Sequence, residues 1–396
     1  MADHDLDYRI VDVDNHFYEP RDSFTRYLDS ASIDRAVRPV VGPDGREVIM
    51  AADRPVTFID RQIYDEVGRP GSLREMLRKM KTGTGAGDAY QWTEVKPEYR
   101  DRDARLAVMD GQGVEACVLF PSVAIVVEHF LDDPADLYLN LHSFNRFLKE
   151  TWGFAYQDRI HTVPLVSLRD VDRAVTELEW LLESGARVLG MRPGPAYGLA
   201  PSDPVFDPFW ARVDEAGISV VFHLTESSYN EKVSVQWGEA PDASDFGMSA
   251  WQWMNTYGDR PIMETLSALI YDNMFQRFPN LTVVSVENGC DWVPYFVRRL
   301  DKMRGLGRNG PWKRGQLPER PSEIFRRHVL VTPYPEDDVR PMVDLVGVEP
   351  LVLGSDWPHP EGLVEPADYI RVLRDLEPAQ QRQVMRENGL RVLGRA

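Results

Sequence analysis

Histidines and carboxylates that follow apolar, strand-like stretches are the first residues in this sequence that could do chemistry. Asp14 and His16 follow one such stretch, His223 ends a second, and Asp356 follows a third. Taken singly, each has a simpler explanation as a helix cap, a surface histidine or a hydrogen-bonded core histidine. Asp14 and His16 stand at i and i+2, so in an extended segment they can reach one cation together. Two imidazoles and two carboxylates suit one divalent metal ion, Zn or Mn, with a position open for water or substrate.

The elements that must position these residues alternate between short apolar strands and amphipathic helices. Residues 163–166, 188–191 and 220–223 have the composition of buried strands. Between the first two, Asp170 is the predicted cap of a helix with apolar residues at the i, i+3, i+4, i+7 spacing of one buried stripe. Gly185 is the predicted end of that helix. Strands that alternate with helices predict parallel pairing and right-handed crossovers.

The same unit recurs along the chain and gives about eight strands. They are expected to end near Asp14, Phe120, Val166, Met191, His223, Val286, Thr332 and Ser355. This number predicts a single α/β domain over residues 1–396, a (β/α)8 TIM barrel. A doubly wound open sheet is the competing fold, but its glycine-rich turn after the first strand is absent from residues 15–20.

Two long segments interrupt this rhythm, after strands one and five. Residues 30–100 are expected to form a small hairpin-rich region, and residues 225–258 form the second insertion. Long segments that follow barrel strands lie over the C-terminal face, where barrel active sites are found. We expect both to fold over the metal site as a lid, and packing or a subunit interface is the alternative.

Composition and charge limit the partners. Lys and Arg number 45 against 63 Asp and Glu, for a formal charge of −18, which disfavours nucleic acid and anionic membranes. Cys117 and Cys290 are the only cysteines, too few for a disulfide framework, and the N-terminus lacks the pattern of a signal peptide. We therefore expect a cytoplasmic protein that binds a small molecule. The expected assembly is a homodimer, for which the long insertions are the candidate interface.

Several motifs resemble the aminocarboxymuconate-semialdehyde decarboxylase-like branch of the amidohydrolase superfamily, amidohydrolase family 2. They are Val11-Asp12-Val13-Asp14-Asn15-His16, Arg192-Pro193-Gly194-Pro195, Phe222-His223, Phe278-Pro279-Asn280-Leu281, Gly354-Ser355-Asp356-Trp357-Pro358-His359 and Glu387-Asn388-Gly389-Leu390-Arg391. The resemblance covers most of the chain, but the segment from about 30 to 100 only poorly. It implies a metal-dependent barrel whose members decarboxylate aromatic or dienoic acids, or hydrolyse or hydrate related compounds.

Two positions depart from the family pattern. Asp14-Asn15-His16 resembles the acidic form of a first motif that is usually His-x-His, which implies a harder ligand set. Glu287 stands after strand six, where the family often has a catalytic histidine. The resemblance implies that Glu287 is a base or a further ligand, or that the usual chemistry is lost. His359 is the candidate to supply the missing imidazole, and a structural turn is its alternative role.

Three further residues are candidates for substrate binding. Arg192 follows strand four, where its guanidinium could bind a substrate carboxylate through two parallel hydrogen bonds. A salt bridge with one of the many acids is equally consistent with the sequence. Trp251 and Trp253 of the second insertion could stack on a planar substrate, and buried packing is their simpler role.

The function that these features favour is metal-dependent, non-oxidative decarboxylation of a carboxylated aromatic or unsaturated acid. Asp356, or a water that it holds, is the expected proton donor to the carbon that loses CO2, and Glu287 or His359 adjusts protonation nearby. The first alternative is metal-dependent hydrolysis of a C–N, ester or C–C bond. The second is a metal-free binding protein derived from the fold, because the histidine after strand six is absent.

Overall fold

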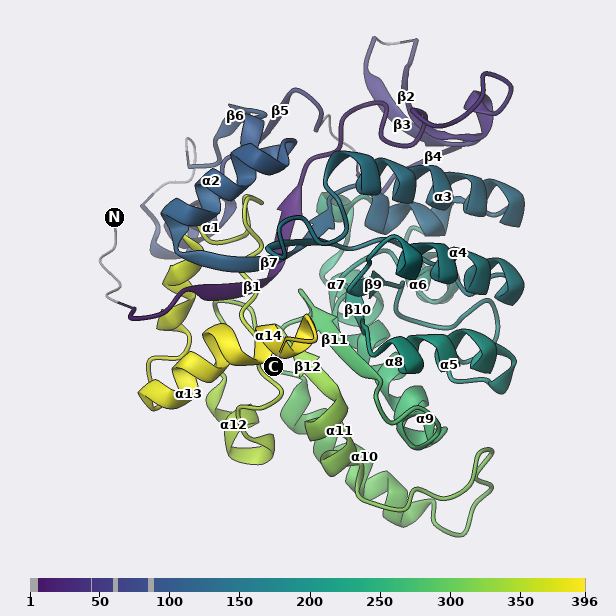
Figure 1. Cartoon of the computed structure of the whole chain (residues 1–396), viewed down its shortest axis with the longest axis vertical. Helices are drawn as coiled ribbons and strands as arrows, with labels where there is room; N and C mark the ends of the chain where they lie inside the picture. The colour runs from purple at the N-terminus through teal and green to yellow at the C-terminus, as the bar shows by residue number, and fades with distance from the viewer. Residues whose placement is uncertain (1–5, 44, 60–62, 85–88, 396) are drawn as a thin grey trace.

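The structure is a computed structural model that describes residues 6–43, 45–59, 63–84 and 89–395 (Figure 1). Parallel strands from both halves of the chain form its centre. One sheet has the order β1-β7-β8 and a second has the order β12-β11-β10-β9. The strands are Ile10–Phe17 (β1), Val114–Pro121 (β7), Ile160–Thr162 (β8), Val188–Gly190 (β9), Ser219–His223 (β10), Thr282–Val286 (β11) and Val329–Val331 (β12).

Short bridges join the two sheets into a ring. Three parallel bridges span the gaps: Leu165 with Gly190, Val331 with Leu351, and Asn15 with Trp357. The segment 351–357 thus lies between β12 and β1 as the eighth strand position, and the N–H of Val13 donates to the carbonyl of Leu353 over 2.9 Å. The chain is a (β/α)8 barrel, as predicted.

The third strand is shorter than the sequence predicts. The apolar run at 163–166 was expected to be the strand, but β8 covers Ile160–Thr162 and only Leu165 of that run forms a bridge. Pro164 explains the difference, because it has no N–H to donate to a ladder. The neighbouring backbone still pairs across the gap, and the N–H of Val166 donates to the carbonyl of Gly190 over 3.0 Å.

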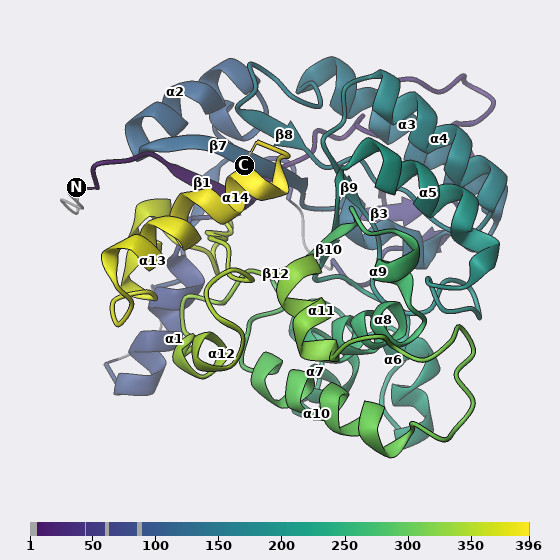
Figure 2. The ribbon, with the colours of Figure 1, turned by 60° about the horizontal axis from the view of Figure 1, so that its bottom comes forward.

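Helices follow the strands and surround the barrel (Figure 2). The helix α4 (Val171–Glu183) forms where predicted: Asp170 accepts a hydrogen bond from the N–H of Arg173, and Gly185, with φ 91°, follows its end. The others that flank the strands are α2 (Arg102–Gln112), α3 (Pro134–Thr151), α5 (Asp207–Ala216), α8 (Asp259–Tyr271), α9 (Met274–Arg277), α10 (Val293–Leu306), α11 (Pro321–His328), α12 (Arg340–Val346) and α13 (Pro378–Arg382).

The barrel interior is filled by β-branched and other apolar side chains that alternate with outward-facing ones. Val11, Val13 and Val221 belong to one buried cluster with Leu390 and Val392. The last two lie on α14 (Asn388–Val392), so the C-terminal helix covers the N-terminal end of the barrel. The opposite end, where the strands finish, is left for the inserted segments.

The first insertion contains two separate sheets. The antiparallel strands β2 (Val37–Val41), β3 (Glu47–Ala51) and β4 (Arg54–Pro55) form one, and the N–H of Val37 donates to Asn140 Oδ1 of α3 over 2.7 Å. The other sheet consists of β5 (Glu66–Gly68) and β6 (Trp92–Glu94), with α1 (Ser72–Thr82) between them. The second insertion carries two short helices, α6 (Tyr229–Lys232) and α7 (Ala250–Thr256).

The β5–α1 part of the first insertion rests on the loop that follows the last strand position. The N–H of Leu73 donates to the carbonyl of Pro360 over 2.9 Å. Gly68 approaches the same proline so closely that a Cβ at position 68 would lie 2.7 Å from Pro360 Cγ. Only glycine fits this contact, and it fixes the insertion against the C-terminal end of the barrel.

No helix within the described residues is both long and apolar enough to cross a membrane.

Candidate metal centre and its cavity

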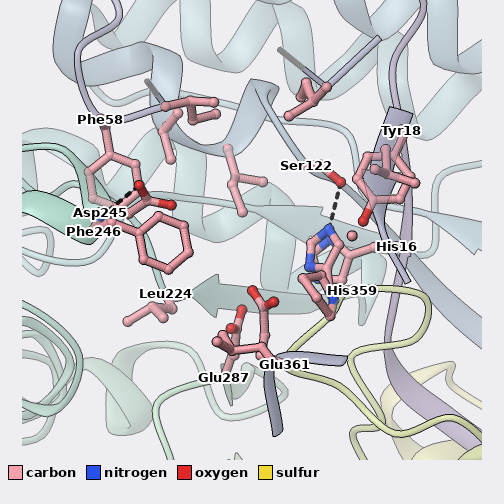
Figure 3. A pocket seen from close by; sticks show the side chains of 18 of the residues that line it. His16, Tyr18, Phe58, Ser122, Leu224, Asp245, Phe246, Glu287, His359 and Glu361 are labelled. Atoms are coloured by element: carbon pink, nitrogen blue, oxygen red, sulfur yellow. Dashed lines mark hydrogen bonds between the residues drawn. The ribbon is translucent and has the colours of Figure 1, made fainter. Parts of the chain in front are cut away.

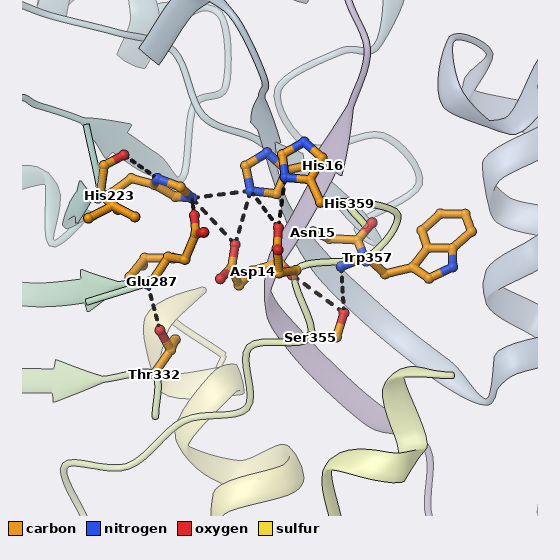
Figure 4. A network of polar contacts seen from close by, with 12 residues as sticks. Asp14, Asn15, His16, His223, Glu287, Thr332, Ser355, Trp357 and His359 are labelled. Carbon is orange, nitrogen blue, oxygen red and sulfur yellow. Dashed lines mark hydrogen bonds and ion pairs between the residues drawn. The ribbon is translucent and has the colours of Figure 1, made fainter. Parts of the chain in front are cut away.

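The side chains of Asp14, His16 and His223 meet at the C-terminal end of the barrel (Figure 4). The two Nε2 atoms of the imidazoles are 3.1 Å apart. Oδ1 of Asp14 lies 3.2 Å from Nε2 of His16 and 3.5 Å from Nε2 of His223. All three residues are buried. The i, i+2 spacing on β1 thus places Asp14 and His16 on one side of the strand, facing the end of β10.

Asp356 reaches the same cluster from the eighth strand position. Its Oδ1 lies 3.5 Å from Nε2 of His16, and its N–H donates to the carbonyl of Asp14 over 2.8 Å. Asp356 and Glu287 each have a φ of 55°. This left-handed conformation costs a non-glycine residue about 1 kcal/mol or more and is concentrated at functional sites. Two of the predicted acids therefore share an unusual backbone at the end of a strand.

Glu287 follows β11 and faces His223. Its Oε2 lies 3.2 Å from Nε2 of His223. The backbone of Glu287 is held on both sides: its N–H donates to Oγ1 of Thr332 over 2.9 Å, and its carbonyl accepts from the hydroxyl of Tyr334 over 2.6 Å. The residue that replaces the expected histidine is thus beside the cluster.

His359 contacts two members of the cluster. Its ring stacks on His16 with 4.0 Å between the centroids, and its Nδ1 lies 2.9 Å from Oδ1 of Asp356. Its Nε2 lies 2.7 Å from Oγ of Ser122, which also donates to the carbonyl of Phe17 over 2.8 Å. Because Ser122 has a single hydroxyl hydrogen and gives it to Phe17, it accepts one from His359. With that hydrogen on Nε2, Nδ1 of a neutral His359 has none, so Nδ1 accepts a hydrogen from the Asp356 carboxyl group when that group is protonated.

A layer beneath the cluster was missed by sequence reasoning. Asp12 accepts hydrogen bonds from Oγ of Ser355 over 2.6 Å and from Nδ2 of Asn15 over 2.8 Å, and burial raises the pKa of Asp12 to about 7. Arg105 donates to the side chain of Asn15 and, over 2.7 Å, to the carbonyl of His16, and burial lowers the pKa of Arg105 to about 10. Asp12 interrupts the apolar run of β1, and this was the only local sign of the layer in the sequence. No local sequence feature indicated Arg105 or Ser122.

The electrostatics of the cluster fit a divalent cation. Burial raises the pKa of Glu287 and of Asp356 well above the ordinary range, and neighbouring carboxylates add to both shifts. Burial also raises the pKa of Asp14, but the close imidazoles of His16 and His223 outweigh it and leave that pKa low. The Oδ1 atoms of Asp14 and Asp356 are buried and accept no well-formed hydrogen bond from the described residues. A cation beside these oxygens and the two imidazole nitrogens would offset the buried negative charge.

The cluster opens into a cavity of about 460 Å³ (Figure 3). His16, His223, Glu287 and His359 line one end of it. Apolar and aromatic residues from 58–92 and 245–257 form much of the remaining wall, so both insertions contribute to it. Among the described lining residues, the charged side chains apart from histidine are acids, and none is Lys or Arg: Asp245, Glu287 and Glu361.

Arg192 lies outside the described lining of this cavity. Its Nη1 donates to Oγ of Ser228 over 2.8 Å, and its Nε lies 3.8 Å from Oε1 of Glu128. The structure thus places Arg192 in the ion pair that the sequence left open as its other role. Arg192 instead lines a small adjoining hollow together with His223, and its role as a carboxylate clamp stays a prediction.

The two tryptophans of α7 are separated by the structure. Trp253 lines the cavity and lies edge-on to Tyr257, with 5.0 Å between the ring centroids. Trp251 is outside the described lining and packs against Trp237 with 5.4 Å between the centroids. Of these two tryptophans only Trp253 lines the described cavity, and contact of either with substrate stays a prediction.

Comparison with known proteins identifies the family to which the chain belongs. A model of the amidohydrolase family matches residues 11–395. An amidohydrolase from Mycobacterium avium subsp. paratuberculosis K-10 superposes with a TM-score of 0.89 at 35% identity, over 98% of each chain. A dihydroxybenzoic acid decarboxylase from Polaromonas sp. JS666, solved with manganese and 2-nitroresorcinol, shares the fold with a TM-score of 0.60 at 15% identity, over 98% of this chain and 97% of the other.

A curated relative is 2-amino-3-carboxymuconate-6-semialdehyde decarboxylase from Dictyostelium discoideum, 21% identical over 193 residues. That match spans 48% of this chain and 49% of the relative, about half the length of each. The family match, by contrast, extends from β1 to the last described residue. The resemblance predicted from the motifs is confirmed, and the chain belongs to the amidohydrolase family.

Proposed function

We propose that the protein is a metal-dependent decarboxylase of a carboxylated aromatic or unsaturated acid. The observation that carries the proposal is the meeting of Asp14, His16, His223 and Asp356 at the strand ends, beside Glu287 and at the end of a cavity. The decarboxylases among its structural and curated relatives support the reaction class. One divalent ion, manganese or zinc, is the proposed cofactor, and manganese is present in the Polaromonas relative.

The four ligands would hold the cation, which when bound would polarise a substrate oxygen next to the leaving carboxylate. This chain's residues do the rest. The bond between the carboxylate and its carbon breaks, CO2 leaves, and the electron pair stays on the carbon, which must then take a proton. Asp356, or a water held by it, gives that proton, and Glu287 adjusts protonation from its place against His223.

His359 and Ser122 are positioning residues in this scheme. The contact of 2.9 Å between Nδ1 of His359 and Oδ1 of Asp356 fixes the direction of the carboxylate, and Ser122 fixes the imidazole. The proposed lid follows from the same cavity: the described lining residues of the two insertions would limit the access of water to the carbon while it is protonated.

Hydrolysis by the same centre is the second candidate, and one observation favours it. The described lining of the cavity has acids but neither Lys nor Arg, and Arg192 is paired with Glu128. A neutral ester or amide would enter such a cavity without the repulsion that a free acid meets.

One experiment separates the two candidates. The purified protein, loaded with manganese or with zinc, is offered hydroxylated benzoates and dienoic acids, and released CO2 is measured. In parallel, neutral aryl esters and amides are offered and the freed acid is measured. CO2 from at least one acid is the expected result; cleavage of esters or amides with no CO2 from any acid would favour hydrolysis instead.

A further inference from the structure

The cavity is larger and more apolar than a small hydroxylated benzoate requires. Its volume of about 460 Å³ lies within the ~300–1,000 Å³ of sites that enclose drug-sized ligands. A single carboxylated ring at the metal end would leave the wall formed by the insertions in contact with water. That wall is built from side chains whose burial against a ligand is favourable.

The aromatic part of the wall is one packed unit that joins both insertions. Phe58 of the first insertion lies 5.5 Å from Tyr257 of the second, and Tyr257 lies 5.0 Å from Trp253, as centroid distances. Phe58 and Tyr257 are buried, whereas Trp253 is 46% exposed. In Figure 3, Phe58 and Phe246 stand across the cavity from His16 and His359. The apolar surface is therefore continuous from the interior to the mouth.

The mouth itself is apolar and exposed. Four large side chains line the cavity and are also exposed to solvent: Leu77 (53%), Trp92 (49%), Phe246 (58%) and Trp253 (46%). A group of exposed apolar side chains around a pocket marks a binding site. Because this group is continuous with the metal end of the same cavity, its natural occupant is a part of the substrate itself.

The charges of the cavity limit what that part can be. Glu287 and Glu361 stand near the metal end and Asp245 beside the aromatic wall, and no described lining residue is Lys or Arg. One carboxylate of a substrate can be neutralised by the bound cation. Among the described lining residues, a second negative group near the metal end would meet Glu287 and Glu361 and no cationic side chain.

We propose that the substrate is an acid whose reacting end carries an uncharged apolar substituent, an alkyl chain or a second aromatic ring, that extends along the Phe58–Trp253 wall to the mouth. This inference rests on the proposed function for the placement of the carboxylate at the metal. It goes further by assigning the two insertions to the recognition of an extended apolar group.

The test uses binding, so that it does not depend on turnover. The manganese-loaded protein is titrated calorimetrically with benzoate, 4-phenylbenzoate, 4-hexylbenzoate and the dianion terephthalate. These acids lack the ring hydroxyl that assists loss of CO2. We expect the phenyl or the hexyl derivative to bind at least about tenfold more tightly than benzoate, since even one methylene in an apolar pocket is worth about tenfold. Whichever of the two binds better identifies the substituent as aryl or alkyl. Terephthalate is expected to bind no better than benzoate.

Two matched pairs of variants locate the effect. Trp253→Ala and Leu77→Ala remove rim side chains. Trp237→Ala and Met80→Ala remove side chains that are 70% and 59% exposed in the same two insertions but lie outside the described lining. Each rim variant should reduce several-fold the affinity that the phenyl or hexyl substituent adds relative to benzoate. Each control variant should retain that added affinity.

Equal affinity for benzoate and both extended acids, or equal losses in rim and control variants, would overturn the inference. So would tighter binding of terephthalate. A change of oligomeric state in the rim variants without any effect on the substituent's gain would assign the mouth to a subunit interface instead. Release of CO2 from hydroxylated benzoates is measured separately, so a decarboxylase without the substituent effect contradicts the inference alone. A substituent effect with no CO2 contradicts the proposed function alone.

Discussion

At one end of the cavity the side chains stand at the ends of barrel strands, and at the other they stand on inserted segments. Asp14, His16 and His223 are buried, and hydrogen-bonded backbone fixes the strands that carry them. Trp253 and Leu77, on the opposite wall, come from short helices and are about half exposed. The rigid strand end is suited to holding the reacting groups in one geometry. The inserted end is suited to substrate recognition, which can change between relatives without disturbing the metal site.

The largest effect is expected from removal of a metal ligand, because this disrupts the strand end of the cavity and leaves the inserted end intact. The purified protein should carry about one divalent ion per chain, and His16→Ala or His223→Ala should lose it, because each removes an imidazole from a four-ligand set. Metal analysis after dialysis measures the loss. His142→Ala is the control, since that histidine pairs with Glu177 on the outside of the barrel. Full metal content in both ligand variants would contradict the site.

The next largest effect should come from Glu287. Glu287→Gln keeps the size of the side chain but removes a carboxylate that lies 3.2 Å from His223. We expect turnover to fall by at least about a hundredfold, the low end for a group that moves protons, with metal content and thermal stability retained. Glu179→Gln, on the surface beside Arg212, serves as the control. Unchanged turnover would assign Glu287 a structural role.

A substitution of Ser122 tests whether the strand-end site depends on the contact between Ser122 and His359. Ser122→Ala removes the partner of His359 Nε2 and leaves the four ligands untouched. Loss of a supporting contact of this kind typically costs ~10–100-fold in activity or metal affinity. We expect a fall of about tenfold in kcat with little change in KM. A rise in KM alone, or an equal loss in Ser322→Ala, which removes a half-buried hydrogen bond from α11 to Asp301 of α10, would show that Ser122 does not act through His359.

The smallest effect should come from the inserted wall, and it should depend on the substrate. Phe246→Ala removes a ring that is 58% exposed and lines the cavity. Metal content should be unchanged, and kcat/KM should fall several-fold for an extended acid but little for a single-ring acid. Steady-state kinetics with both acids measure the difference. Equal losses for both acids would mean that the wall supports the reaction itself and not the preference.

The difference between the two ends also explains what the sequence could predict. Strand ends carry a recognisable signal, because short apolar runs stop at polar residues such as His223 and Asp356. The pairing of distant strands then brings these residues together once the barrel is inferred. The inserted wall has no such period, and its packing depends on contacts between Phe58 and Tyr257, which are far apart in the chain. Sequence reasoning therefore identified α7 as a candidate but could not distinguish Trp253 from Trp251.

Two arginines of the barrel also have partners that the sequence could not predict. Arg192 follows its strand as predicted, yet the position of Glu128 on another segment decides that it forms an ion pair. Arg105 lies on α2, on its buried side, where nothing local separates it from a surface arginine. Its partners, the Asn15 side chain and the His16 carbonyl, belong to β1 and become visible only in the folded chain.

The contact between Gly68 and Pro360 has a consequence for any attempt to exchange the inserted wall between relatives. The Leu73 N–H and the Pro360 carbonyl, together with the close approach at Gly68, form a matched junction between the β5–α1 part of the insertion and the loop that follows His359. A chimera that imports the insertion alone would meet a foreign surface at this junction, directly behind the imidazole that holds Asp356. A working chimera must therefore exchange both the insertion segment and the loop after His359. These two segments are far apart in the sequence but adjacent in the folded chain.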